Sequence, residues 1–173
     1  IKSPIMVLTA GTDFFFFIIN YGLEPGIPNL YTLQALCKVL EKRNIRNFPV
    51  HIKLDTGMHR LGFMSDELDD LVTFLSDTDR VAVKSVYSHL AASDDSECDD
   101  FTHAQVALFK ANADKLSENL GYKPMYHVLN SAGIERFPQY QFDMVRLGIG
   151  IYGVSAIPEV KLSPVASFKC KIL

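Results

Sequence analysis

The sequence contains no tryptophan, only three cysteines and no long apolar run. Cys37, Cys98 and Cys170 are far apart and form no C-x-x-C pair, which favours free thiols in a reducing compartment such as the cytoplasm. The longest apolar run, FFFFII at 14–19, is far shorter than the roughly 20 residues that cross a bilayer. The sequence therefore predicts neither a disulfide-stabilised secreted domain nor a membrane protein.

A strong excess of charge of one sign is also missing. The net charge is −3 and the isoelectric point about 5.9, so no overall field would hold nucleic acid or an anionic membrane. Hydrophobic residues make up 48% and charged residues 21%, which is typical of a globular domain. No second histidine or cysteine lies near His89 with the spacing of metal ligands, so we predict no metal site.

The two ends of the chain predict a piece of a longer protein. The chain begins at Ile1 without a methionine, and it stops inside the alternating apolar segment SFKCKIL. We expect residues 1–156 to form one domain, and residues 157–173 to be a linker and the first strand of a β domain.

Strand-like and helix-like segments alternate along residues 1–156. Such alternation predicts an α/β fold with parallel strands joined by right-handed crossovers, either a doubly wound sheet or a (β/α)8 TIM-type barrel. Strands are expected at 5–8, 23–27, 50–54, 81–88, 125–129 and 142–146, and helices at 12–21, 30–44, 65–76, 99–120 and 131–136. Polar residues follow several of these strands, and in a barrel such strand ends meet on the face that carries the chemistry.

The segment HIKLDTGMHRLGF (51–63) gathers several polar groups at the end of one strand. D-T-G also occurs in aspartic proteases, but those are all-β, and a turn is the simpler interpretation of these three residues. Lys53 alternates with Val50, Ile52 and Leu54, so it points to one face, and a buried lysine there needs a partner. Arg60 cannot be that partner while both side chains are cationic.

Two glycine-containing segments suggest an anion site. Ser131 follows the fifth expected strand, and Gly148 and Gly150 follow the sixth. Loops after the last two strands of a barrel commonly bind phosphate through backbone N–H groups, although glycines there could serve only tight turns. Arg146 and His89 stand at strand ends nearby, and a lone histidine in such a place is more often structural than catalytic.

Four of these segments together resemble the pyridoxal-phosphate-dependent alanine racemases of bacteria. They are KLDTGMHRLGF, SHLAASD, HVLNSAGI and FDMVRLGIGIYG, in the family's order and with suitable intervals. The resemblance implies a partial (β/α)8 barrel comprising about strands 3–8, with the first two βα units missing, followed by the start of a C-terminal β domain. It also implies an enzyme that interconverts L- and D-alanine and supplies D-alanine for peptidoglycan.

The resemblance assigns a role to each residue of the cationic group. Lys53 would be carboxylated on its Nζ, as in many members, which turns a cation into an anion that can pair with Arg60. Arg60 would bond the phenolic oxygen of pyridoxal 5'-phosphate and lie near the substrate carboxylate. Arg146 would donate to the pyridine nitrogen of the cofactor, and His89 would orient Arg146.

The resemblance also implies a phosphate site. Ser131 would bind the cofactor phosphate together with the N–H groups of Gly148 and Ile149, and Asn130 would support it. A homodimer is implied as well.

The family's two proton-transferring residues are not found in the chain. The Schiff-base lysine would precede Ile1 and the opposing tyrosine would follow Leu173, so racemisation through an external aldimine would need the longer parent, and we expect the fragment alone to be inactive. Three alternatives stay open: a related barrel enzyme for another amino acid, a non-catalytic pyridoxal-phosphate carrier, and a structural piece with no site of its own.

Overall fold

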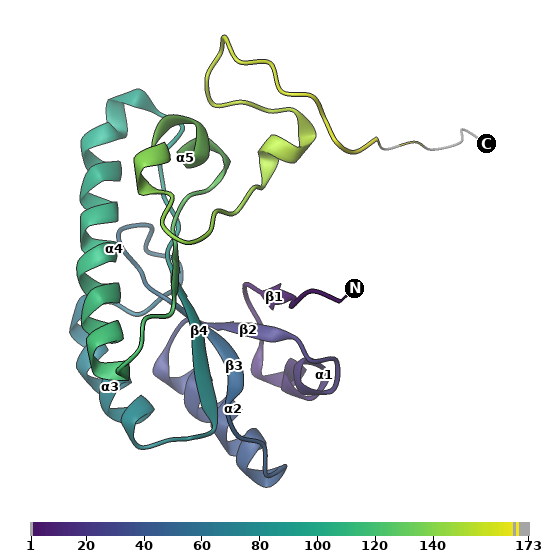
Figure 1. Ribbon diagram of the computed structural model, residues 1–173, viewed down its shortest axis with the longest axis vertical. Helices are drawn as coiled ribbons and strands as arrows, with labels where there is room; N and C mark the ends of the chain where they lie inside the picture. Colours follow the sequence, from purple (N-terminus) through teal and green to yellow (C-terminus); the bar gives the residue numbers. More distant parts are fainter. Residues whose placement is uncertain (1, 168, 170–173) are drawn as a thin grey trace.

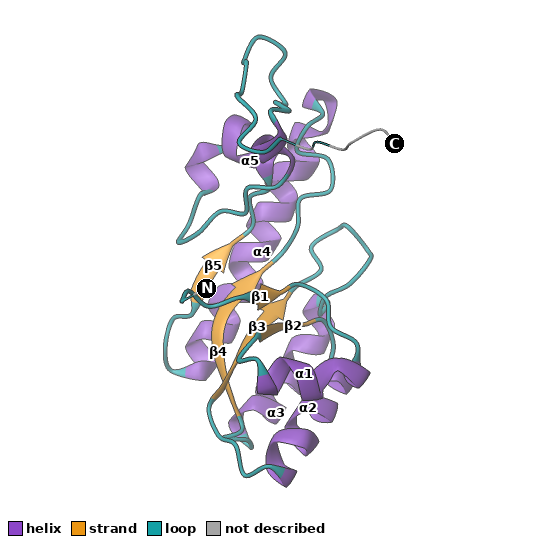
Figure 2. Cartoon of the chain, turned by 90° about the vertical axis from the view of Figure 1, so that its right-hand side faces the viewer, coloured by secondary structure: helices purple, strands orange, loops and turns teal. Residues whose placement is uncertain are grey.

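The computed structural model describes residues 2–167 and 169 and contains one parallel sheet (Figure 1). Its strands lie side by side in chain order, β1-β2-β3-β4-β5, and every neighbouring pair is parallel. The strands are β1 Met6–Val7, β2 Glu24–Ile27, β3 Phe48–Lys53, β4 Val81–Tyr87 and β5 Met125–His127. The sheet curves like part of a barrel wall (Figure 2), so the expected parallel α/β fold is confirmed.

Helices connect the strands and surround the curved sheet, with α3 and α4 along one flank (Figure 1). The α-helices are α1 Phe15–Asn20, α2 Leu30–Lys42, α3 Leu68–Ser76, α4 Asp99–Leu120 and α5 Ser131–Arg136. Short 3-10 turns are η1 Thr12–Phe14, η2 Ser65–Glu67, η3 Ser96–Cys98, η4 Pro138–Tyr140 and η5 Ile149–Tyr152. As expected, α4 ends at Gly121, which adopts the left-handed conformation (φ 71°) that glycine tolerates at a helix end.

The sheet has an apolar face and a polar face. Val50 and Ile52 of β3 and Val86 of β4 are fully buried in the core beneath the helices. The alternate residues of the same strands, among them His51 and Lys53, point to the inner face. The inner face is therefore the polar one, and it leads to the carboxyl ends of the strands.

The sixth expected strand, 142–146, does not form. Phe142 has a left-handed backbone (φ 51°) that an extended strand cannot contain, and the segment begins in a turn. Two bonds still hold the segment beside β5, from the Asp143 N–H to the Tyr126 carbonyl at 3.1 Å and from the Arg146 N–H to the Leu129 carbonyl at 3.0 Å. Arg146 is therefore placed at the sheet's carboxyl end without a regular strand.

The remaining expectations concern the C-terminal residues, membrane-spanning helices and metal sites. Residues 165–167 are not in a strand, and most of the strand expected in 165–173 lies outside the described residues. Among the described residues, no helix is long and apolar enough to span a membrane, and no cluster of three metal-ligating side chains occurs.

Candidate functional site

A pocket of about 530 Å³ opens at the carboxyl ends of the strands. It is lined by six of the eight side chains or loop residues that the sequence singled out: His89, Asn130, Ser131, Arg146, Gly148 and Ile149. Leu8, which follows β1, and Ala132 at the start of α5 also contribute to its wall. Segments distant in the sequence are thus brought to one place, as the barrel rule requires.

The Ser131 hydroxyl is contacted by two backbone amides, and we call this group of atoms the Ser131 cradle. Its Oγ accepts hydrogen bonds from the N–H groups of Gly148 at 2.9 Å and Gly150 at 3.1 Å. Asn130 caps α5, since its Oδ1 accepts from the Gly133 N–H at 2.9 Å, and it also accepts from the Ser93 hydroxyl at 2.8 Å. The amides that contact Ser131 therefore come from Gly148 and Gly150, whereas the resemblance gave the Ile149 amide a role at the cofactor phosphate and not at Ser131.

Four acceptors hold the guanidinium of Arg146. Its Nη1 donates to the Nδ1 of His127 at 2.6 Å and to the carbonyl of His127 at 3.0 Å. Its Nη2 donates to the carbonyls of Ser88 and Val128. Among the described residues no hydrogen bond joins Arg146 to His89, so the histidine that contacts the guanidinium is His127, and the centre of the Tyr87 ring lies 5.4 Å from the guanidinium carbon.

His127 was not singled out from the sequence. It belongs to the expected strand 125–129, and its ring is stacked on Tyr87 with the ring planes 3° apart. The register pairs Tyr87 with His127, so both face the inner side of the sheet. Its position on the inward-facing side of an expected barrel strand is the sequence feature by which His127 could have been identified.

Burial and the neighbouring cations keep the histidine of the pocket neutral. Burial first, and then the charges of Arg146, Arg60 and Lys53, lower the pKa of His89 to about 4. Burial lowers the pKa of Arg146 to about 10, which still leaves its guanidinium charged at neutral pH. The pocket thus combines a charged donor, a neutral histidine and backbone amides, a set that suits an anionic ligand.

The pKa of Lys53 is affected by Arg60 and Arg146 as well. Burial, the charge of Arg60 and the charge of Arg146 lower its pKa, and Asp55 opposes them. Its Nζ stands 6.0 Å from the centre of the Tyr87 ring. Arg60 is exposed and borders a separate hollow with Asp55 and Leu61, so neither Lys53 nor Arg60 lines the pocket that contains Arg146.

The D-T-G segment is a turn. Oδ1 of Asp55 accepts from the N–H groups of Gly57 at 2.9 Å and His59 at 3.1 Å. Thr56 bonds the Ser88 hydroxyl at 2.8 Å, which ties the turn to the end of β4. These contacts are those of a local turn, as the sequence predicted.

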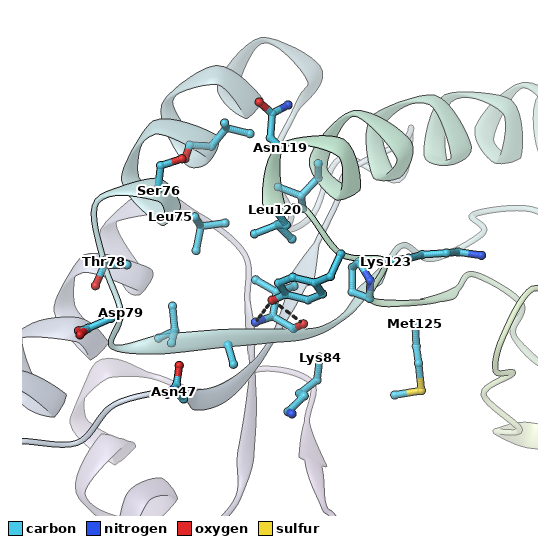
Figure 3. A pocket seen from close by; sticks show the side chains of 17 residues that line it. Asn47, Leu75, Ser76, Thr78, Asp79, Lys84, Asn119, Leu120, Lys123 and Met125 are labelled. Atoms are coloured by element: carbon cyan, nitrogen blue, oxygen red, sulfur yellow. Dashed lines mark hydrogen bonds between the residues drawn. The ribbon is translucent and has the colours of Figure 1, made fainter.

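A larger hollow of about 640 Å³ lies at the opposite, amino-terminal ends of β4 and β5 (Figure 3). The side chains around it come from the end of α3, the start of β4 and the end of α4, and include Leu75, Leu120 and Lys84. Two dashed bonds in Figure 3 join the Tyr122 hydroxyl to the backbone of Val83. This end is organised for packing, as the amino-terminal face of a barrel usually is.

Comparisons with known proteins agree with this geometry. The family model described as "Alanine racemase, N-terminal domain" matches residues 1–156. Alanine racemase 1 of Oceanobacillus iheyensis is 39% identical over 159 residues, covering 88% of the chain and 42% of that protein. Alanine racemase of Treponema denticola is 30% identical over 163 residues, covering 90% and 42%.

Solved structures give the same result. Alanine racemase of Clostridium difficile in complex with cycloserine has a TM-score of 0.85 at 26% identity, covering 95% of this chain and 46% of that one. Alanine racemase of Bartonella henselae with covalently bound pyridoxal phosphate has a TM-score of 0.79 at 27% identity, with the same coverage. The chain spans less than half the length of the relatives it matches. It belongs to the alanine racemase N-terminal domain family.

Proposed function

We propose that the chain is the barrel part of an alanine racemase, about strands 3–8 of a (β/α)8 barrel, and that the whole protein interconverts L- and D-alanine with pyridoxal 5'-phosphate. The observation that carries the proposal is the joint placement of Arg146 and the Ser131 cradle on one pocket. The names of the relatives support alanine as the substrate. D-alanine for peptidoglycan would be the product that the cell uses.

The donor set fits the phosphate group of this cofactor. The two glycine amides already direct their hydrogens at the Ser131 oxygen, so the hydroxyl proton is free to be donated to a phosphate oxygen. A Cβ at position 150 would lie 2.9 Å from the Leu147 side chain and 3.5 Å from Ser131 Oγ. Glycine keeps this approach open, and the Ile149 amide adds a further donor beside it.

Arg146 fits the pyridine nitrogen. A guanidinium donates hydrogen bonds but does not release its proton to the ring, so the bound cofactor would be a modest electron sink. Such a sink suits an enzyme that only removes and returns the Cα proton. His89, kept neutral first by burial and then by the charge of Arg146, would lie against the cofactor as a packing and orienting group.

Lys53 and Arg60 would complete the site as an ion pair after carboxylation of Lys53. Carbamate formation requires a neutral amine, and the lowered pKa of Lys53 increases the neutral fraction. Labelling with ¹³C-bicarbonate should give a carbamate signal in the full-length protein that is absent from Lys53→Arg. A labelled protein without that signal would contradict the assignment.

The deciding experiment assays the full-length protein with pyridoxal phosphate against a panel of amino acids. Racemisation of alanine above all others is expected, and preference for a different amino acid would overturn the substrate. Cofactor binding without turnover would indicate a carrier protein. Among the described residues neither a lysine nor a tyrosine lines the pocket, so the 173-residue chain alone should not racemise alanine. We further propose a homodimer, which sedimentation of the full-length protein would test.

A further inference from the structure

A line of polar side chains, all buried except the partly exposed Glu24, crosses the inner face of the sheet, with one side chain from each of four neighbouring strands. Glu24 lies on β2, His51 on β3, Ser85 on β4 and His127 on β5. Successive contacts are 2.9 Å from Glu24 to His51, 2.6 Å from His51 to Ser85 and 2.8 Å from Ser85 to His127. The line ends at Arg146, 2.6 Å from His127.

This line is unusual for the inside of a barrel. His51 is 4% exposed, and Ser85 and His127 are 0% exposed, whereas barrel interiors are mostly filled by branched apolar side chains. Buried polar groups destabilise a fold unless every one of them is hydrogen-bonded. Here both nitrogens of each ring have a partner, so the line is fully satisfied.

A β-bulge builds the line into the sheet. Val50 pairs with Val83, but the next residue, His51, pairs with Ser85, so Lys84 is an extra residue on β4. Without the extra residue, strict alternation would direct Ser85 to the same face as Val83, beneath the helices. The bulge turns Ser85 inward, where it bridges two histidines that are too far apart along the sheet to meet directly.

The donor and acceptor roles along the line follow from one end. A guanidinium only donates, so Nδ1 of His127 accepts from Arg146 and its proton must reside on Nε2. That N–H donates to Ser85, whose own hydroxyl proton then goes to Nδ1 of His51. His51 therefore carries its proton on Nε2 and donates it to the Glu24 carboxylate.

We propose that Glu24, His51, Ser85 and His127 act as positioning residues that fix the guanidinium of Arg146. The proposal rests on the proposed function, in which Arg146 meets the pyridine nitrogen of the cofactor. The one-way chain fixes the plane of the guanidinium, and it links a half-buried cation to a carboxylate at its far end. Burial lowers the pKa of both histidines, to about 3 for His127, which keeps the rings neutral as the chain requires.

The first test needs no cofactor. The full-length protein without pyridoxal phosphate is labelled with ¹⁵N-histidine, and single variants His51→Gln and His127→Gln assign the two rings. At pH 7 both rings should be neutral with the proton on Nε2. A His127 ring with its proton on Nδ1, or a doubly protonated His51, would overturn the chain.

The second test measures binding of pyridoxal phosphate by absorbance titration. Ser85→Ala removes the bridging hydroxyl and should weaken binding about tenfold, as the loss of one buried hydrogen-bonded link predicts. Glu24→Gln keeps an acceptor without its charge and should have a smaller effect in the same direction. The control is Val86→Ala, a fully buried residue of the same strand that faces the helices, and it should leave the dissociation constant unchanged.

The outcomes separate the two proposals. If pyridoxal phosphate does not bind the unaltered full-length protein, the proposed function fails, and with it the role of the chain at the cofactor, while the ring tautomers still decide whether the chain exists. If the tautomers are as expected but Ser85→Ala and Val86→Ala bind the cofactor equally well, the positioning role is overturned and the proposed function stands. Ser85→Ala protein that fails to fold is replaced by Glu24→Gln, which changes one terminal group only.

Discussion

The two ends of the sheet differ in what their hollows contain. The hollow at the amino-terminal ends is the larger, about 640 Å³ against about 530 Å³ at the carboxyl ends. Asp79, one of the residues that line it, pairs with Arg46, and the two side chains are 51% and 59% exposed. The carboxyl end instead holds the half-buried guanidinium of Arg146 and backbone amides aimed at one hydroxyl. Volume therefore does not locate the chemistry, whereas a half-buried charge and convergent donors do.

The two ends also treat the backbone differently. At the amino end the Tyr122 hydroxyl donates to the carbonyl and accepts from the N–H of Val83, at 3.2 Å and 3.1 Å, so a side chain completes an unpaired stretch of β4. At the carboxyl end carbonyls of Ser88, His127 and Val128 accept from Arg146. The first arrangement closes the sheet, and the second makes the sheet the support of a functional group.

The largest difference between the ends should come from removing Arg146. Arg146→Ala leaves the carbonyls of Ser88 and Val128 and the ring of His127 without their donor, and it should lower the free energy of unfolding by about 3 kcal/mol. Pyridoxal-phosphate binding and alanine racemisation should be lost with it. Urea unfolding, cofactor titration and racemase assays of the full-length protein measure these effects.

The matched control at the amino end is Lys84→Ala. Lys84 is exposed and borders the larger hollow, so its loss should change the free energy of unfolding by less than about 0.5 kcal/mol. Racemase activity should not change. Equal losses in both variants would contradict the functional difference between the two ends.

Much of the carboxyl end could be predicted from sequence, because its residues lie at strand ends. Periodicity located every strand of the observed sheet, since apolar runs of this length have few alternatives in an alternating pattern. Once the strands are parallel, their carboxyl ends must meet, and His89, Ser131 and Arg146 come together.

The sequence could not predict which residues of neighbouring strands pair with one another. The strand expected at 142–146 failed because one residue, Phe142, takes a left-handed backbone, and no residue pattern signals that. The line from Glu24 to His127 depends on register and on a bulge after Val83, and both are set by neighbouring strands rather than by local sequence. The sequence therefore identified Lys53 as a candidate site residue but did not identify His51, Ser85 or His127.

A second contrast concerns glycines with positive φ at each end. Gly62, in the loop after β3, has φ 134°, and a Cβ there would lie 2.5 Å from the Asp55 nitrogen. Gly62→Ala should therefore destabilise the protein by about 3 kcal/mol, since backbone strain and overpacking act together. Gly121, before β5, has φ 71° with nothing near its Cβ position, so Gly121→Ala should be milder, at about 1 kcal/mol. Thermal and urea unfolding of both variants would check the order, and a reversed order would contradict it.

Acid should weaken the carboxyl end first. The folded pKa of His127 is about 3, below the ordinary 6.5, because of burial first and then the charges of Arg146 and His51. Below pH 6.5 the unfolded chain binds a proton that the folded one refuses, so stability is complete above 6.5 and falls as pH drops toward the folded pKa. The loss from His127 should be on the order of 2 kcal/mol at pH 5.

This loss can be assigned to its end of the sheet. Urea unfolding at pH 7, 6 and 5 should give a shallower pH dependence for His127→Gln than for the unaltered protein. Amide protection factors, which are corrected for the intrinsic pH dependence of exchange, should fall on acidification at 127–131 before they fall at 81–83. An unchanged slope in the variant would mean that other groups cause the acid sensitivity.

The smallest contrast is between two ion pairs, one near each end of the sheet. Arg136 contacts Asp99 at 2.6 Å and the Ser93 carbonyl at 2.8 Å, and its side chain is only 14% exposed. Asp99→Ala should lower the free energy of unfolding by about 1 kcal/mol, because it leaves a poorly hydrated guanidinium with one partner fewer. Asp79→Ala removes the partner of the exposed Arg46 and should change the free energy of unfolding by less than about 0.5 kcal/mol.

Added salt should reduce the effect of Asp79→Ala more than the effect of Asp99→Ala, since ions screen exposed pairs more strongly than half-buried ones. Equal salt sensitivity of the two variants would show that the Arg136 pair, despite its low exposure, is solvated like the pair at the amino end.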